Sequence, residues 1–303
     1  MQEQAPGIAD VLRHWTPDVL WIGMLLGAGG LYYRGLRVVN GAQPRLRHPA
    51  WKAWSFGVGL ALLAVATLSP VEYYGNQMLW VDFLGFLLIT LWAPPLLLLG
   101  SPLTLAFRAS GPKMRRRLRR AYRSPLVRWL TFPIASWLIF AVATYLWQFS
   151  VLTDLAAQHR LVREAQEVSL LAVALLFWLP ALCADPVRWR IAYPLRGLYV
   201  FVEMTHKALF AAMFLSVTSP FHSYIAAHMP AYGPGPLDDQ RKAIMILWLG
   251  GNLVFVAALA GIIARWMQYE GRTTARLDAR LAKEREAARR HREALEQVFR
   301  KGV

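Results

Sequence analysis

The fold is decided by one stretch of sequence, MLWVDFLGFLLITLWAPPLLLLGSP at residues 78–102. It is apolar for long enough to cross a bilayer, which takes about 20 residues of helix. Two features interrupt it, Asp82 near its start and the Pro94-Pro95 pair near its end. Because proline has no backbone N–H, the carbonyls that it frees need donors from neighbouring helices or water, which predicts a helix packed inside a bundle. Since an ionisable side chain in lipid is costly, Asp82 is expected to face the bundle interior or to mark the water boundary.

The composition is that of a polytopic membrane protein. Of the 303 residues, 56% are hydrophobic and 17% are charged, whereas a soluble domain of this size would carry more charge. The net charge of +16 would suit nucleic acid, but most arginines lie in short runs between apolar stretches, which is typical of cytoplasmic loops. We therefore predict no nucleic-acid partner. The single cysteine, Cys183, excludes an intrachain disulfide and a paired-thiolate metal site within one chain.

Seven apolar stretches predict an all-α fold of seven transmembrane helices. The helices are expected at residues 19–33, 51–68, 78–99, 126–149, 168–183, 198–217 and 243–267. Basic residues concentrate before the second, fourth and sixth stretches and after the seventh. By the positive-inside rule this places the N-terminus outside and the C-terminus in the cytoplasm of a bacterial inner membrane. The predicted parts are a short outer segment at 1–16, a seven-helix domain at 17–267 and a basic cytoplasmic helical tail at 268–303.

This orientation predicts which polar side chains share a compartment. Asp82, Gln148 and Glu167 are expected in the outer leaflet, because each lies near the outer end of its helix. Asp154 and His159 belong to the loop between the fourth and fifth helices. All five side chains should therefore gather at the outer face.

The sixth predicted helix carries an intramembrane cluster of Glu203, His206 and Lys207, in its inner half or near the middle. Glu203 and Lys207 are spaced i to i+4, so they share a helical face and can neutralise one another. Two interpretations remain open. The cluster is either an internal ion pair that holds helices together or a proton or ion path through Glu203 and His206.

The outer segment SPFHSYIAAHMPAYGPGP at residues 219–236, here called the histidine loop, contains His222, His228 and Met229. Imidazole and thioether groups are suitable copper ligands. The loop would lie on the outer side of the membrane. The alternative is that these are ordinary histidines at the protein surface or the lipid interface.

The tail at 268–303 is predicted to be a helix, because alanine, arginine, leucine and glutamate dominate it. Glu286 and Arg290 form a supporting i to i+4 pair. Leu281, Ala288 and Leu295 fall seven residues apart and give only a thin apolar seam. The tail is interpreted as a solvated helix or an arm on the membrane surface, with docking to a partner subunit as the alternative.

A series of short motifs follows a fixed order along the chain. They are LSP at 68–70, APP at 93–95 with LLLLGSP behind it, YLW at 145–147, LFWLP at 176–180, PLDDQ at 236–240 and LWLGG at 247–251. In this order and spacing they resemble the bacterial seven-helix CtaG-type cytochrome c oxidase assembly factors, over nearly the whole membrane domain. The resemblance implies an integral membrane factor that inserts copper into, or matures, a haem-copper terminal oxidase. Its implied partners are oxidase subunits and membrane lipid.

The chain departs from this family at the positions where the resemblance implies metal ligands. Family histidines four residues apart in the span before the APP motif fall here on Asp82 and Phe86, and two further ones fall on Gln148 and Glu167. Histidines at i and i+4 share one helical face and suit copper, whereas oxygen ligands are poor for Cu(I). We therefore expect this metal site to be absent or altered. Copper is the candidate cofactor, and none is firmly predicted.

Three functions remain open. In the first, the chain still assists oxidase assembly and holds copper through Met78 and the histidine loop, or holds none. In the second, it is a non-catalytic accessory subunit of a respiratory complex and has lost its metal ligands. A transporter using Asp82 and the intramembrane cluster is the third, although the middle helices have few ionisable residues for a continuous path. No enzyme is predicted, since no nucleophile, base and orienting group recur at a suitable spacing.

Overall fold

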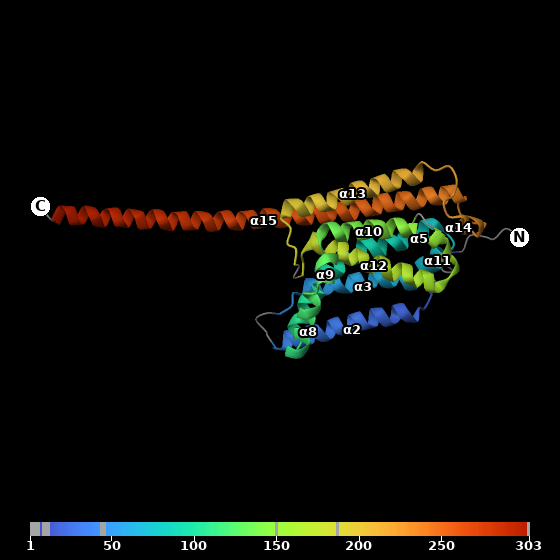
Figure 1. The fold of residues 1–303 in the computed structure, drawn as a ribbon, viewed down its shortest axis with the longest axis horizontal. Coiled ribbons are helices and arrows are strands. Elements are labelled where there is room, and N and C mark those ends of the chain that lie inside the picture. Colours follow the sequence, from blue (N-terminus) through green and yellow to red (C-terminus); the bar gives the residue numbers. More distant parts are fainter. Residues whose placement is uncertain (1–6, 8–12, 43–46, 149–150, 186–187, 302–303) are drawn as a thin grey trace. The chain divides into compact units, whose positions relative to one another are not determined.

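The computed structural model describes residues 7, 13–42, 47–148, 151–185 and 188–301, and every element in these ranges is helical (Figure 1), which confirms the all-α class. The chain divides into two compact units, Met1–Ala258 and Leu259–Val303. The helices are α2 Val19–Ala42, α3 Ala50–Leu68, α4 Pro70–Gly75, α5 Leu79–Leu87, η2 Leu88–Trp92, α6 Ala93–Leu99, α7 Pro102–Ala109, α8 Pro112–Tyr122, α9 Pro125–Leu130, α10 Pro133–Gln148, α11 Val151–Gln158, α12 Arg160–Leu182, α13 Tyr193–Leu215, α14 Ser223–Ala227 and α15 Pro236–Lys301.

Several helices are long and apolar enough to cross a membrane, so this is a multi-pass membrane protein. Within the described residues there are 5 such segments, or up to 6 if α10 and α11, which are bent by 66°, form one span. The segments are Ala50–Leu68, Leu79–Ala109, Arg160–Leu182, Tyr193–Leu215 and Pro236–Arg290. The first predicted span falls on α2, which is helical but is not among them. The number seven and the orientation of the termini stay predictions.

The helix boundaries differ from the predicted ones where proline or paired charges decide them. The span predicted at 126–149 begins too early, because α9 ends at Leu130 and α10 starts at Pro133. Proline is tolerated at this first position, since an N–H there would have no acceptor within the helix. Phe149 and most of the predicted outer segment at 1–16 lie outside the described residues. Conversely, α12 begins at Arg160, well before the predicted start at 168, because the charges of its first turns are paired with other helices.

The deciding stretch forms a broken helix that packs against both α3 and α12. Its α-helical start, α5, passes into the π-helical η2 before α6 begins with the two prolines. The N–H of Ala93 bonds to the carbonyl of Leu88, which is the wider spacing of a π-turn. The helix widens here because Pro94 and Pro95 have no N–H to give to the carbonyls of the preceding turn.

One of the carbonyls freed by these prolines is satisfied from a neighbouring helix. In a regular helix the residue at position 94 would donate to the carbonyl of Thr90. Here the indole N–H of Trp178 on α12 donates to it instead, over 3.1 Å. Trp178 is completely buried. The expectation that an interior helix supplies the missing donor is therefore confirmed.

Glycines allow the deciding stretch to approach α3 closely. A Cβ atom at Gly59 of α3 would lie 2.9 Å from the side chain of Leu97, and one at Gly100 would lie 2.7 Å from Phe56. Small residues at a helix contact in a membrane let backbones approach and gain van der Waals contact. This close contact positions α5 and α6 against α3.

In the second unit, α15 continues as helix to Lys301, which confirms the helical tail. Side-chain pairs along it follow the i to i+4 pattern. Glu286 pairs with Arg290 as predicted, and Arg289 lies 3.4 Å from Glu293. The cytoplasmic location of the tail stays a prediction.

The bond from Trp178 gives a first testable prediction. Replacing Trp178 with Phe keeps an aromatic ring but leaves the Thr90 carbonyl without its donor, which should lower the free energy of unfolding by about 1–3 kcal/mol. Denaturant unfolding in detergent measures this. The matched control is Trp248→Phe on α15, whose side chain is 50% exposed and whose replacement should cost clearly less. Equal losses in the two variants would refute the role of this hydrogen bond.

Candidate functional site

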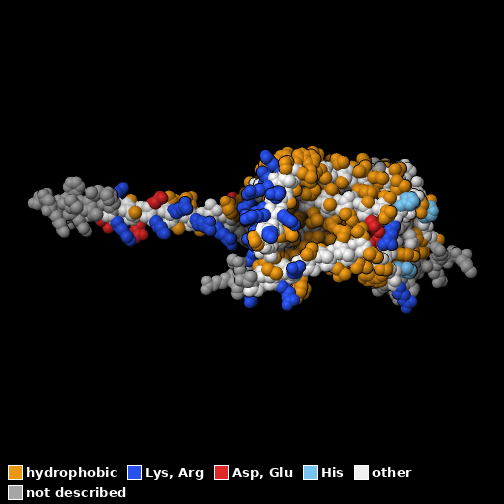
Figure 2. Space-filling model, turned by 60° about the horizontal axis from the view of Figure 1, so that its bottom comes forward, with side chains coloured by type: hydrophobic (Ala, Val, Ile, Leu, Met, Phe, Trp, Pro, Cys, Tyr) orange, Lys and Arg blue, Asp and Glu red, His pale blue; other side chains and the backbone are white. Residues whose placement is uncertain are grey.

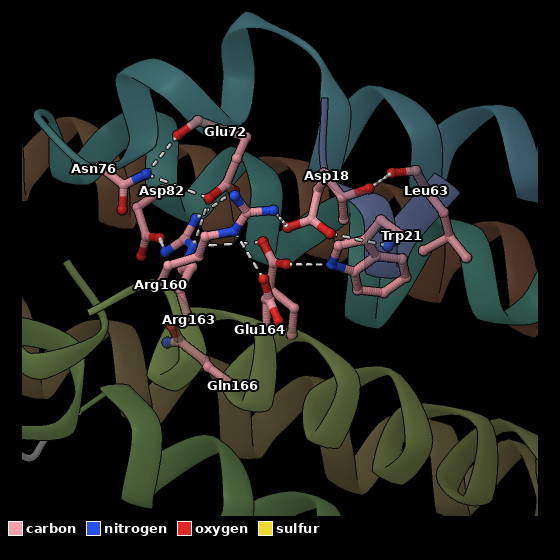
Figure 3. A network of polar contacts seen from close by, with 12 residues as sticks. Asp18, Trp21, Leu63, Glu72, Asn76, Asp82, Arg160, Arg163, Glu164 and Gln166 are labelled. Atoms are coloured by element: carbon pink, nitrogen blue, oxygen red, sulfur yellow. Dashed lines mark hydrogen bonds and ion pairs between the residues drawn. The ribbon is translucent and has the colours of Figure 1, made fainter. Parts of the chain in front are cut away.

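The candidate site is centred on Arg163, in the first turn of α12 (Figure 3). Its Nε and Nη2 donate to the two carboxylate oxygens of Glu72 on α4, over 3.2 and 3.1 Å. Its Nη1 donates to Asp82 in the first turn of α5. Its Nε also lies 3.4 Å from Glu167, one turn further along α12. We call these four residues the Arg163 cluster.

The Arg163 cluster is largely buried and joins four helices. Arg163 is 9% exposed, Asp82 3% and Glu167 4%, so Asp82 faces the bundle interior. The fourth helix is α2, because the indole N–H of Trp21 donates to Glu167 over 2.6 Å. Removing charges from water is costly unless they are paired and hydrogen-bonded. Each helix therefore has to be in place for the cluster to form.

The charge of Arg163 favours the ionised form of Glu72. Burial by itself raises the pKa of Glu72, but the charge of Arg163 and its hydrogen bonds outweigh this and hold the pKa below its usual range. The same balance applies to Asp18, just before α2. Burial raises the pKa of Asp18, but the hydrogen bonds from the Trp21 backbone and from Arg160 lower it by more, so the net shift is downward.

A polar pocket of about 450 Å³ opens beside the Arg163 cluster. Arg160 bridges Asp18 of the chain before α2 and Glu164 of its own helix, over 3.0 and 2.9 Å. The pocket lining includes four carboxylates and two guanidiniums, from Asp18, Glu72, Glu164, Glu167, Arg160 and Arg163. It is therefore acidic overall and suits a polar or cationic group rather than an apolar one.

The four positions at which the family resemblance implies histidines converge on one small cavity. Asp82, Phe86, Gln148 and Glu167 all line it, together with Arg163 and Gln166. Its volume of about 10 Å³ is close to what one water molecule needs. Asp82 Oδ2, both polar atoms of the Gln148 amide and Gln166 Oε1 are buried and make no hydrogen bond within the part of the chain that the structure describes.

The other two side chains predicted at the outer face lie outside this cavity. Asp154 of α11 lies 3.4 Å from the hydroxyl of Ser223 on α14. His159 directly precedes α12, where its backbone carbonyl accepts from Arg163 N–H. Asp154 therefore connects α11 to the histidine loop, whereas His159 contributes a backbone carbonyl to the first turn of α12.

The histidine loop does not bring its three candidate ligands together. His222 and Met229 line one cavity of about 10 Å³ that also includes Asp239. His228 is outside this lining, and its ring stacks on Tyr224 with ring centres 4.1 Å apart. Among the described residues no group of three or more His, Cys, Asp or Glu side chains could hold a metal ion.

In the intramembrane cluster, Oε2 of Glu203 lies 3.3 Å from Nδ1 of His206. No ion pair between Glu203 and Lys207 is found among the described side chains, so their mutual neutralisation stays a prediction. The Lys207 ammonium lies over three aromatic rings, 4.9 Å from Phe86, 5.4 Å from Phe140 and 5.7 Å from Phe210, where cation–π attraction favours it.

Sequence reasoning missed Arg163, Glu72 and Trp21 as members of the site. Arg163 and Glu167 lie one helical turn apart just before an apolar run, which is a readable sign of a buried pair. Glu72 and Trp21 carry no comparable signal, because only the folded bundle brings α2 and α4 to α12.

Sequence comparisons identify relatives of this chain. The family model for cytochrome c oxidase caa3 assembly factors (Caa3_CtaG) matches residues 30–269. Similar curated proteins are uncharacterized proteins of Mycobacterium bovis and Mycobacterium tuberculosis, each 27% identical over 289 residues, and one of Mycobacterium leprae, 26% identical over 291. These alignments cover 91% of this chain but 42–43% of the relatives, so the chain spans less than half their length. No solved structure matches.

Replacing Arg163 tests the cluster. Arg163→Gln leaves the buried carboxylates of Asp82 and Glu167 and the partly buried one of Glu72 without their cation, which should lower the free energy of unfolding by about 3–5 kcal/mol. The matched control is Arg160→Gln, three residues earlier, whose side chain is 64% exposed and whose loss should cost at most about 1 kcal/mol. Unfolding in detergent, followed by tryptophan fluorescence, measures both. A similar cost for the two arginines would contradict the central role of Arg163.

His222 gives a prediction for the pH dependence of stability. Burial lowers its pKa below the ordinary 6.5, against the opposing charges of Asp154 and Asp82. The unfolded chain therefore binds a proton at a higher pH than the folded one, and stability falls as the pH drops below about 6.5. His222→Gln should reduce the loss of unfolding free energy between about pH 7 and pH 5.5, whereas His228→Gln, at an exposed position, should not. Identical pH profiles for the wild type and His222→Gln would exclude this assignment.

Proposed function

The chain belongs to the cytochrome c oxidase caa3 assembly factor family, and we propose that it acts in the maturation of a haem-copper terminal oxidase. In this role it is a non-catalytic protein of the bacterial inner membrane, with its N-terminus outside and its C-terminus in the cytoplasm. It holds an immature oxidase subunit and does not itself carry copper. Its partners are oxidase subunits and membrane lipid.

One observation carries the part of the proposal that concerns copper. The family's histidine positions meet at a single cavity, yet they hold two carboxylates, an amide and a phenyl ring. Cu(I) favours thiolate, thioether and imidazole ligands. Asp82 and Glu167 are in addition already paired with Arg163. The residues present therefore do not fit copper.

The polar pocket supports a holding role. Its acidic lining lies directly beside the Arg163 cluster, which fixes four helices around it. A rigid acidic pocket suits a cationic side chain of a client subunit, since charge complementarity steers association and fixes register. A stable accessory subunit with the same fold is the alternative, favoured by the same loss of metal ligands. Transport is less well supported, because the middle helices have few ionisable residues for a continuous polar path.

Affinity purification of the full chain from membranes, followed by metal analysis, tests the proposal. We expect it to copurify with copper-poor, immature oxidase and to be absent from the mature enzyme. After anaerobic loading with Cu(I), the purified chain should hold well below one copper per chain. The physical reason is the oxygen-rich lining of the cavity, which binds soft metals poorly.

A variant provides the positive control for copper. Phe86→His with Gln148→His returns imidazoles to two positions of the cavity without breaking the Arg163 cluster, and it should raise the copper content. A tight one-to-one copper complex of the wild type, lost in Asp82→Asn, would overturn the claim that the chain carries no copper. Equal stoichiometry with the mature oxidase would instead identify an accessory subunit.

A further inference from the structure

Helix α8 (Pro112–Tyr122) separates basic and apolar side chains onto opposite sides. An α-helix turns by about 100° per residue. Projected on this basis, the apolar side chains fall within one sector of about 100° and the basic ones fill a sector of about 200°. The apolar set is Met114, Leu118, Ala121 and Tyr122, and the basic set is Lys113, Arg115, Arg116, Arg117, Arg119 and Arg120. The helix contains no acidic residue.

The rest of the protein covers this helix only in part, at Leu118 and at Tyr122, whose ring packs edge-on against Phe107 of α7. No residue of α8 is buried, and Met114 in its apolar sector is 50% exposed. The following helix, α9, adds the exposed apolar side chains of Leu126 and Trp129, at 65% and 59%. Lys and Arg side chains gather at one end of the bundle in the first unit, and the histidines on the viewed face lie at the other end (Figure 2).

The position of α8 is fixed at the end of a membrane-spanning segment. The candidate span Leu79–Ala109 ends just before the helix begins. Arg115 donates from Nε to the carbonyl of Phe107 and from Nη2 to that of Ser110, each over 3.1 Å. These bonds tie α8 to the end of α7. The helix therefore lies at the level of the membrane surface.

We propose that α8, together with α9, is a binding site for anionic phospholipids in the membrane interface. The apolar sector and Trp129 enter the boundary between headgroups and acyl chains, while the arginines bind lipid phosphate oxygens. Guanidinium groups suit this task because their planar donors match phosphate oxygens. An acidic protein would pair with the basic sector but would leave the apolar sector exposed, whereas an anionic bilayer matches both. This site is independent of the oxidase and of the polar pocket.

Lipid titration of the full chain in detergent, read by native mass spectrometry, tests the proposal. We expect phosphatidylglycerol to bind at least about tenfold more tightly than phosphatidylcholine, since each Lys or Arg near an anionic surface adds a favourable contribution. The variant R116Q/R117Q/R119Q/R120Q should lose this preference. Glutamine is a good helix former, so circular dichroism should show that α8 remains helical. High salt should weaken the preference, because exposed charges are screened.

A control variant separates a defined site from general charge. R285Q/R289Q/R290Q/R292Q removes the same number of arginines from the second unit and should keep the full preference. A second test variant, Leu118→Glu, leaves every arginine in place but charges the apolar sector, and it should also weaken phosphatidylglycerol binding.

Several results would overturn the proposal. An equal loss in the two arginine variants would mean that net charge alone attracts the lipid. Competition by inorganic phosphate would indicate an ion site, and loss of a copurified acidic protein with unchanged lipid preference would indicate a protein partner. An unchanged preference in Leu118→Glu would exclude insertion of the apolar sector.

Discussion

The arrangement of the first unit depends on one guanidinium, that of Arg163 (Figure 3), which three carboxylates from α4, α5 and α12 share. Trp21 of α2 joins this group through its hydrogen bond to Glu167. In a lipid-surrounded bundle the hydrophobic effect does not drive helices together, so packing and polar contacts select their arrangement. A buried ion pair adds little net stability compared with an apolar replacement, but it penalises every arrangement that leaves a charge alone. The Arg163 cluster thus acts mainly by specifying which helix ends meet.

A second constraint operates deeper in the bundle. The Pro94-Pro95 pair opens the backbone of the deciding stretch, and Trp178 closes it again by donating to Thr90. Two hydrogen bonds thus attach α12 to the same broken helix at two levels, one from Arg163 to Asp82 and one from Trp178 to Thr90. The small cavity at the positions where the resemblance implies histidines lies between elements held in this way.

Much of this could be predicted from the sequence, for reasons that are physical. Proline chemistry required an external donor near residues 94–95, and the cost of a charge in lipid required a place for Asp82 in the bundle interior or at the water boundary. The identity of each partner could not be predicted, because Trp178 and Arg163 reach their partners only through the packing of α12. Spacing shows that Glu203 and Lys207 share a helical face, but it does not show that the Lys207 ammonium lies over the rings of Phe86, Phe140 and Phe210.

The place of Arg163 in the chain has a consequence for biosynthesis. Glu72 and Asp82 leave the ribosome long before it, and N-terminal parts of a chain generally fold first. An arginine entering lipid alone is strongly disfavoured, whereas here it arrives where two carboxylates have already been inserted. A chain that stops before α12 therefore lacks the cation that pairs with Glu72 and Asp82.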